Sequence, residues 1–492
     1  MTTPLLFALF ASVAAAAPPI VIDGQFDDWR NVAVALDDPA DAPGAPVDFG
    51  EVRVTHDDRF VYLLIELGRT VNVQRLRGRF DILLDVDADV KTGRTVLGMR
   101  GVELIVEFSP REGPDRAGRG AAVSFPTDEG DRNRLSPYMI GLVSAPTYAG
   151  DVIELRMERG VVFPGAKSLF SAASIRGRLV LLDRNDTVLD DTTVFTYDLT
   201  PIGPAPPDRG PDPLARPAGT DLRVMAWNTG IDGLRTQPAN FKRILRAIDP
   251  DVILFQELTE ADHPRQIEAS LARWVPLPAG QRWTVLRGAG GGRLRCAVAS
   301  RHELNSYTAL DPLLMPDRPD RSIRVTGGEL TLSGHRLLVV SVHLRCCGFA
   351  GSFEDRTRAV EADAIRRAID DAVASGRFEG VIVGGDLNLV GSRWPLDVLA
   401  ENLRVVETLQ FGGRSNTTWS DVRQPFLPGR LDFMLRSDTA PAVLGSFVFD
   451  SRRLGPRWLR HHRLRAGDTV EASDHQPVVV DLGWKQSGPP GR

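Results

Sequence analysis

The chain has 492 residues, of which 42% are hydrophobic and 25% charged, and its formal net charge is −5. This balance is typical of a globular protein and excludes a disordered or fibrous chain, while the length favours two domains with separate cores. Acidic residues outnumber basic ones before residue 219 and the reverse holds after it, so the second part is more compatible with an anionic substrate. That basic excess is too small for a protein that coats nucleic acid.

Residues 1–17, MTTPLLFALFASVAAAA, have an apolar run followed by small residues, which is the layout of a secretory signal peptide. The run is too short to span a bilayer, and no later stretch is a transmembrane candidate. No Lys or Arg precedes Leu5, so a plain N-terminal tail is the alternative. The sequence thus predicts a secreted or periplasmic protein.

Residues 18–199 predict an all-β domain. The segment VRVTHDDRFVYLLIEL (52–67) has alternating apolar runs on both sides of Asp57 and Asp58, which predicts a hairpin. Further short strand-like runs follow, separated by turn signals and almost without helical periodicity, and this pattern favours a β-sandwich.

The order of IDGQFDDW, THDDRFVYLLIEL, LDVDADVKTG and GVELIVEF in this domain resembles the carbohydrate-binding module family 9-like group. The resemblance covers most of residues 20–198. It implies a module that attaches to a glycan or to another cell-surface ligand. A structural sandwich without a ligand is the alternative.

The stretch DVDADVKTG places three carboxylates at alternate positions, as in an oxygen-rich calcium loop. An EF-hand would need Gly and Glu where Val90 and Val96 stand. A solvated acidic turn is therefore the alternative to a Ca²⁺ site. The candidate ligands are Asp85, Asp87 and Asp89.

Residues 200–219 are rich in proline and predict an extended, semi-rigid linker. After it, the strand-like runs LRVMAW and DVILFQE alternate with helical patterns such as NFKRILRAI and the long amphipathic stretch 354–375. Mixed strands and helices predict a layered α/β domain over residues 220–485, followed by a tail at 486–492.

Polar residues end or precede the apolar strands of this second domain. A strand fixes its backbone while its tip opens onto a cleft, so such residues are candidates for chemistry. Taken singly, each has a structural explanation as a turn cap, a helix start or a partnered buried histidine. The candidates are Asn228, Glu257, His343, Asp386, Asn388, Asp432, Asp474 and His475.

The combination of these residues is more informative than any one of them. The motifs WN, FQE, SVHL, GGDLN, RLDF and SDHQPV follow in this order, and the series resembles the endonuclease/exonuclease/phosphatase superfamily of metal-dependent phosphoesterases related to DNase I. The resemblance covers residues 220–484. It implies a four-layered α/β/β/α sandwich with the site at one rim of the paired sheets.

The resemblance also implies a divalent-metal site. Glu257 would be the main ligand, with Asn228 and Asp474 near it. Oxygen ligands suit Mg²⁺, with Mn²⁺ as an alternative, and such an ion offsets the charge that builds up on phosphate oxygens.

The remaining motif residues receive catalytic roles from the same resemblance. His475 would accept a proton from the attacking water, and Asp432 would orient it. Asp386 and Asn388 would align the water or stabilise the transition state, and His343 would donate to a phosphate oxygen or to the leaving group.

Two further features lie near the motifs. Trp419, in NTTWSD, is expected to pack the floor of the cleft. The basic stretch 451–468 could supply a phosphate-binding loop, because guanidinium groups pair bidentately with phosphate oxygens; a solvated loop is the alternative. Its cationic side chains are Arg457, Arg460, Arg463 and Arg465, together with His461 and His462.

These observations predict a secreted Mg²⁺-dependent phosphoesterase that hydrolyses a phosphodiester or phosphomonoester with activated water. Nucleic acid, phospholipid and inositol phosphate all stay open as substrates. The alternatives are a catalytically silent binding protein on the same fold and a protein that mainly binds carbohydrate.

The three cysteines are too few for a disulfide framework, and no spacing among them indicates a zinc site. Adjacent cysteines pair only in a strained ring. A disulfide from Cys296 to Cys346 or Cys347 is the hypothesis for an exported protein.

Overall fold

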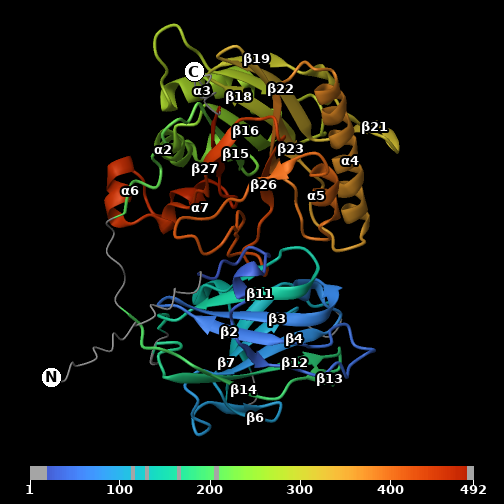
Figure 1. Cartoon of the computed structure of the whole chain (residues 1–492), viewed down its shortest axis with the longest axis vertical. Coiled ribbons are helices and arrows are strands. Elements are labelled where there is room, and N and C mark those ends of the chain that lie inside the picture. Colours follow the sequence, from blue (N-terminus) through green and yellow to red (C-terminus); the bar gives the residue numbers. More distant parts are fainter. Residues whose placement is uncertain (1–18, 112–116, 128–131, 163–167, 204–209, 485–492) are drawn as a thin grey trace, which may run out of the picture.

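The structure is a computed structural model of the chain, and it describes residues 19–111, 117–127, 132–162, 168–203 and 210–484 (Figure 1). The expected signal peptide at 1–17, the tail at 486–492 and part of the expected linker, 204–209, lie outside the described residues. Figure 1 shows a β-rich N-terminal region, blue to green, beside a C-terminal domain of strands and helices, green to red.

The N-terminal β-rich region consists mainly of two antiparallel sheets, and the helical turns described in it are all of the 3₁₀ type: η1 (Asp27–Trp29), η2 (Val73–Arg75) and η3 (Pro137–Ile140). The hairpin expected at 52–67 is confirmed, because β2 pairs with β3 around Asp57 and Asp58. The first sheet has the order β1 (Val34–Leu36), β2 (Val52–His56), β3 (Phe60–Val71), β11 (Gly150–Glu158) and β10 (Val143–Ala145). The second has the order β13 (Val188–Asp191), β12 (Ser174–Leu182), β4 (Arg79–Asp85), β7 (Leu104–Phe108), β8 (Ala121–Pro126) and β9 (Arg132–Leu135); β14 (Phe195–Asp198) also pairs with β12, and β5 (Arg94–Val96) with β6 (Met99–Val102) forms a separate hairpin.

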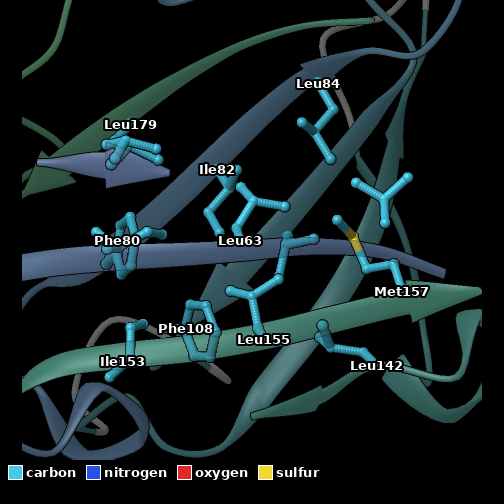
Figure 2. Packing of buried hydrophobic residues seen from close by; sticks show 14 of the residues in the cluster. Leu63, Phe80, Ile82, Leu84, Phe108, Leu142, Ile153, Leu155, Met157 and Leu179 are labelled. Atoms are coloured by element: carbon cyan, nitrogen blue, oxygen red, sulfur yellow. The ribbon is translucent and has the colours of Figure 1, made fainter. Parts of the chain in front are cut away.

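One hydrophobic core joins these two sheets (Figure 2). Leu63 and Leu155 from the first sheet meet Phe80, Ile82 and Phe108 from the second, and all five are buried. Successive strand residues point to opposite faces, so the alternating apolar pattern of the sequence lines this core. Burial of each such side chain contributes roughly 1.5–3 kcal/mol.

The C-terminal domain is built on two six-stranded sheets, each with one parallel pair: β15 with β16, and β23 with β24. The first sheet has the order β17 (Thr284–Arg287), β18 (Arg295–Ser300), β16 (Val252–Leu258), β15 (Leu222–Asn228), β28 (Val478–Gly483) and β27 (Ala442–Val448). The second has the order β19 (Glu303–Ser306), β22 (Val325–Leu332), β23 (His335–His343), β24 (Gly380–Asp386), β26 (Asp432–Arg436) and β25 (Arg404–Val405); β20 (Leu314–Met315) pairs separately with β21 (Arg318–Ser322).

Three hydrophobic clusters place the helices against these sheets. One joins the first sheet to α2 and α3, a second joins the other sheet to α4 and α5, and a third contains residues of both sheets. On β15, Met225 and Trp227 belong to the first cluster, whereas Val224 and Ala226 belong to the third, as the two-residue period of a strand requires. The helices are α1 (Gly233–Thr236), α2 (Pro238–Ile248), α3 (Pro264–Trp274), α4 (Phe353–Ala374), α5 (Trp394–Leu399), α6 (Pro456–His462) and α7 (Asp468–Ala472), with 3₁₀ turns η4 (Thr308–Leu310) and η5 (Ser451–Arg453).

Part of the stretch 200–219, which was expected to be an extended, semi-rigid linker, is docked on the C-terminal domain. Leu214 is buried in the α2–α3 cluster, and Arg216 bonds Asp251 at 2.7 Å. Composition did not indicate this contact, because it depends on individual side chains such as Leu214 and Arg216 that bind the neighbouring domain.

The β-rich region and the C-terminal domain touch directly, and the sheet that contains β11 lies on the side that faces the C-terminal domain (Figure 1). Backbone hydrogen bonds cross the boundary at three places: Ile22 N to Arg414 O at 3.1 Å, Ala121 N to Pro425 O at 2.7 Å, and Ala149 N to Gly391 O at 2.8 Å. Within the described residues, none of the helices combines the length and the apolar character needed to cross a bilayer.

Candidate active site

Five strands of the C-terminal domain bring polar side chains to one edge. β15 ends at Asn228, β23 at His343 and β24 at Asp386, while β26 begins at Asp432. The register places His343 opposite Asp386 and Asp386 opposite Asp432. Strand pairing thus gathers His343, Asp386 and Asp432, whereas Asn228 and His475, which precedes β28, come from the other sheet.

Asp386 lies at the centre of the cluster and is buried. Its Oδ2 accepts hydrogen bonds from Asn228 Nδ2 and Asn388 Nδ2, both at 3.0 Å, and its Oδ1 accepts one from Asn388 N at 2.8 Å. Nε2 of His343 lies 3.6 Å from Oδ2, and Nε2 of His475 lies 3.8 Å from it. Asp386 thus connects both histidines and both asparagines.

Burial raises the pKa of Asp386 to about 7, and the nearby carboxylates of Asp432 and Glu257 add to the rise, although His475 opposes it. Burial, with Arg324 and His475 adding to it, lowers the pKa of His343 well below its ordinary value. His343 is therefore neutral at pH 7, and its Nδ1 is a buried atom without a hydrogen-bond partner among the described residues.

His475 is held by Asp432, whose Oδ2 lies 2.8 Å from Nδ1. A carboxylate only accepts, so Nδ1 carries a proton and Nε2 faces Asp386 and the Asn228 amide, 3.5 Å away. Burial lowers the pKa of His475, but the charges of Asp432 and Asp386 outweigh burial and raise it to about 10. The two carboxylates thus favour the protonated form of His475.

Glu257 reaches the cluster through an irregularity of the backbone. The pairing of β16 with β18 shifts register between Phe255 and Leu258, and Glu257 has a φ of 62°, in the left-handed region. A bulge of this kind re-aims a side chain, and positive φ at a non-glycine residue is typical of functional sites. Oε1 of Glu257 lies 3.7 Å from Nε2 of His343.

The donor set fits a divalent cation. Ligand atoms of Glu257, His343 and Asp386 lie within 4.8 Å of one another, and so do those of Asp386, Asp432 and His475. The two groups share Asp386, and Oδ1 of Asp432 is buried without a hydrogen-bond partner among the described residues. Several carboxylates at close range favour a hard cation with oxygen ligands.

Asp474 lies at the same cavity and is oriented by Trp419, whose Nε1 donates to its Oδ2 at 3.0 Å. Trp419 was expected only to pack the cleft floor, yet it also fixes a candidate metal ligand. Oγ of Ser473 donates to the backbone oxygen of Asn228 at 2.8 Å, which ties the SDHQPV motif to the end of β15.

These residues open into a cavity of about 360 Å³. Its wall includes Glu257, Asp386, Asn388, Asp474 and His475. The β-rich region contributes Asn72, Gln74, Arg75 and Thr147 to the same wall, and sequence reasoning missed all four. No motif marks them, because their role depends on how one domain docks on the other.

The basic stretch 451–468 does not reach this cavity. Trp458 is buried in the α2–α3 cluster, and this anchors α6 with its arginines on the exposed side. Among the described residues that line the cavity, none belongs to this stretch; the arginines expected there were Arg457, Arg460, Arg463 and Arg465.

The acidic loop of the β-rich region differs from the expected calcium set. Ligand atoms of Asp85, Asp87 and Glu103 lie within 4.8 Å of one another, whereas Asp89 accepts from Lys91 N at 3.0 Å and is not part of the group. Glu103 takes its place, because this residue between β6 and β7 lies beside the turn after β4, where its Oε2 accepts from Val86 N at 3.0 Å. Oδ2 of Asp85 is already paired with Arg176 at 3.1 Å.

The expected disulfide from Cys296 is absent, and all three cysteines are free. Cys296 is buried on β18, where its Sγ donates to the backbone oxygen of Arg324 at 3.3 Å. Cys346 and Cys347 are exposed, with their Sγ atoms 2.6 Å apart. Cys347 lines the cavity.

Comparison with known proteins identifies the C-terminal part. The family model described as the Endonuclease/Exonuclease/phosphatase family matches residues 225–475. None of the curated proteins matches the chain.

Solved structures similar to the chain include a 3'-5' exonuclease from Neisseria meningitidis, with 18% identity over 54% of this chain and 100% of that one and a TM-score of 0.39. The human Nocturnin catalytic domain is 16% identical over 54% of this chain and 94% of its own, with a TM-score of 0.37. An AP endonuclease from Archaeoglobus fulgidus is 15% identical over 53% of this chain and 99% of its own, with a TM-score of 0.37.

Proposed function

The chain belongs to the endonuclease/exonuclease/phosphatase family, and from this premise we propose that it is a divalent-metal-dependent hydrolase of phosphate esters. The observation that carries the proposal is the buried cluster around Asp386, where two histidines, two further carboxylates and two asparagines meet at one end of the paired sheets. The α/β/β/α layering typical of the family is part of the proposal.

Glu257 would hold the cation together with Asn228 and Asp474, with Mg²⁺ as the preferred ion and Mn²⁺ as the alternative. Glu257 supports this assignment through its carboxylate, which lies within 4.8 Å of the ligand atoms of His343 and Asp386, and Asp474 lines the same cavity; Asn228 and Asp474 are outside that close group. Bound there, the ion supplies positive charge that stabilises the charge developing on phosphate oxygens and offsets the field of the carboxylates on His475.

His475 acts as the general base in this proposal. Asp432 and Asp386 raise the pKa of His475, and its Nε2, which faces Asp386, would accept a proton from the attacking water when the imidazole is neutral. Asp432 keeps the proton on Nδ1 and stabilises the imidazolium that forms.

Asp386 and Asn388 are placed to align the water and the phosphate group, because both line the cavity beside Nε2 of His475. His343 is neutral and buried behind the cavity wall, with Nε2 3.6 Å from Oδ2 of Asp386, and it is assigned a hydrogen bond to a phosphate oxygen or to the leaving group.

A secreted or periplasmic location belongs to this proposal on the basis of residues 1–17 alone. Calcium binding near Asp85 stays a prediction, with Glu103 in the place of Asp89. A glycan or cell-surface ligand for the β-rich region also stays a prediction.

A panel of phosphate esters tests the proposal. Purified protein is assayed on bis-p-nitrophenyl phosphate, p-nitrophenyl phosphate, sphingomyelin, phosphoinositides and plasmid DNA, each with Mg²⁺ and with EDTA. We expect metal-dependent release of product that His475→Ala abolishes and that His335→Ala retains, because His335 bonds the partly exposed Glu379 away from the cavity. Full activity of His475→Ala would overturn the mechanism.

A further inference from the structure

The catalytic cavity is walled on one side by the β-rich region. The 3₁₀ turn η2 (Val73–Arg75) carries Gln74 and Arg75 to the cavity, and Asn72 caps this turn through Oδ1, which accepts from Gln74 N at 3.0 Å. A module that only attached the protein to another surface would not need to contribute residues to the cavity of the other domain.

The turn is held in place from both domains. Nδ2 of Asn72 lies 3.2 Å from the backbone oxygen of Thr147 in its own region and 3.2 Å from that of Val390 in the C-terminal domain. Gln74 is buried, and its Oε1 accepts from Leu427 N at 2.8 Å. Val390 follows Asn388 by two residues, so the contact is made directly beside the catalytic cluster.

Arg75 lies against Phe426, with its guanidinium carbon 4.6 Å from the ring centroid. Among the described residues that line the cavity, Arg75 is the single arginine or lysine. Within the described part of the chain, Arg75 forms no ion pair with a carboxylate. Partial burial, with Arg119 nearby, lowers the pKa of Arg75, although the Cys347 thiol opposes this change.

We propose that Arg75 is a substrate-binding residue of the catalytic cavity and that it binds the phosphate oxygens of a small phosphate ester. A guanidinium presents two parallel N–H donors that match two phosphate oxygens. The aromatic faces of Phe426 and Trp419, which line the same cavity, are surfaces for the organic part of the ester. The inference rests on the proposed function and narrows its substrate class.

Size and charge both disfavour duplex nucleic acid as the substrate. The cavity of about 360 Å³ falls at the lower end of the range of small-molecule sites, which is roughly 300–1,000 Å³. A duplex carries about one charge per 1.7 Å of its axis and is bound through many cationic contacts. This wall offers one arginine, which suits one phosphate group.

Binding and kinetics of three variants test the inference on the full chain. Inorganic phosphate is titrated calorimetrically, and steady-state kinetics use bis-p-nitrophenyl phosphate. We expect Arg75→Ala to raise the Kd for phosphate and the KM roughly 10- to 100-fold, as the loss of a charge-assisted contact predicts. Arg75→Lys should recover part of the lost affinity, because a lysine keeps the positive charge but lacks the two parallel N–H donors of the guanidinium.

Arg77→Ala is the matched control, since Arg77 is exposed two residues away and does not line the cavity. It should leave both constants unchanged. Wild-type Kd and KM in Arg75→Ala would overturn the inference, and so would plasmid DNA cleaved as efficiently as the small ester.

The phosphate titration needs no turnover, so the two proposals can fail separately. If the wild-type protein binds phosphate but hydrolyses no ester, and if Arg75→Ala no longer binds phosphate, the proposed activity fails and the assignment of Arg75 stands. If His475→Ala abolishes hydrolysis while Arg75→Ala changes neither constant, the activity stands and the assignment fails.

Discussion

Nδ1 of His475 lies 2.8 Å from Oδ2 of Asp432, although 42 residues separate the two along the chain. The pair forms because Asp432 begins β26, next to β24, while His475 precedes β28 of the other sheet. Whenever this histidine is neutral, the bond to Asp432 keeps its proton on Nδ1 and leaves Nε2 directed at Asp386.

Asp432→Asn is expected to lower kcat roughly 100- to 10,000-fold, because an amide can hold the wrong tautomer of the base. It should also move the acid limb of the pH–rate profile to lower pH. Asp432 raises the pKa of His475, so its removal lets the base lose its proton at a lower pH. Kinetics from pH 5 to 9 measure both effects.

The control for this variant is Asp438→Asn, since Asp438 pairs with Arg404 on an exposed surface of the same domain. It should retain wild-type kcat. An Asp432→Asn protein with unchanged kcat would show that His475 does not depend on this carboxylate.

Glu257→Gln is expected to weaken Mg²⁺ binding at least about 10-fold, because it removes a charge from the proposed ligand set. Calorimetric titration of Mg²⁺ measures this, and EDTA treatment followed by added Mg²⁺ should abolish and restore activity. Glu260→Gln, three residues away and exposed, is the control. Equal Mg²⁺ affinity of the Glu257 variant and the wild type would remove Glu257 from the site.

The sequence predicted the residues of the cluster because each follows or precedes an apolar strand. In the structure, β23 pairs with β24 in parallel, and this pairing brings His343, at the end of one strand, opposite Asp386, at the end of the other. The hairpin at 52–67 and the apolar face of α2 were also readable from periodicity. On α4, which covers most of the amphipathic stretch 354–375, Val373 is nevertheless 45% exposed, whereas Ala372 beside it is buried.

Features that depend on contacts between segments far apart in the chain could not be predicted from the sequence. Glu103 replaces Asp89 beside Asp85 because the junction of β6 and β7 packs beside the end of β4, where Glu103 N donates to Leu84 O at 3.1 Å. Arg75 reaches the cavity because one domain packs on the other, and nothing in its local sequence marks this contact. The bulge that orients Glu257 likewise contains no glycine or proline, so the sequence does not indicate it.

The thiols of the protein should react in two classes. Cys346 and Cys347 are exposed and should react rapidly with a thiol reagent in the native state, whereas Cys296 is buried and should react only after unfolding. Burial also raises the pKa of the Cys296 thiol to about 12. A titration of the reduced protein with and without denaturant counts both classes.

Cys296→Ala should remove the slow class and leave the rapid class intact. Three thiols that react at one rate in the native state would contradict the buried position of Cys296. A peptide that links Cys296 to Cys346 or Cys347 in non-reducing mapping would restore the disulfide hypothesis.

Gln74→Ala tests whether the two domains unfold as one unit. The substitution leaves the buried Leu427 N without its acceptor, which costs about 1–3 kcal/mol. If the contact couples the domains, calorimetry should show a lower Tm for the C-terminal domain even though the change lies in the β-rich region. Gln25→Ala, on an exposed turn of the same region, should leave Tm unchanged. A drop confined to the β-rich region would show that the domains dock without stabilising each other.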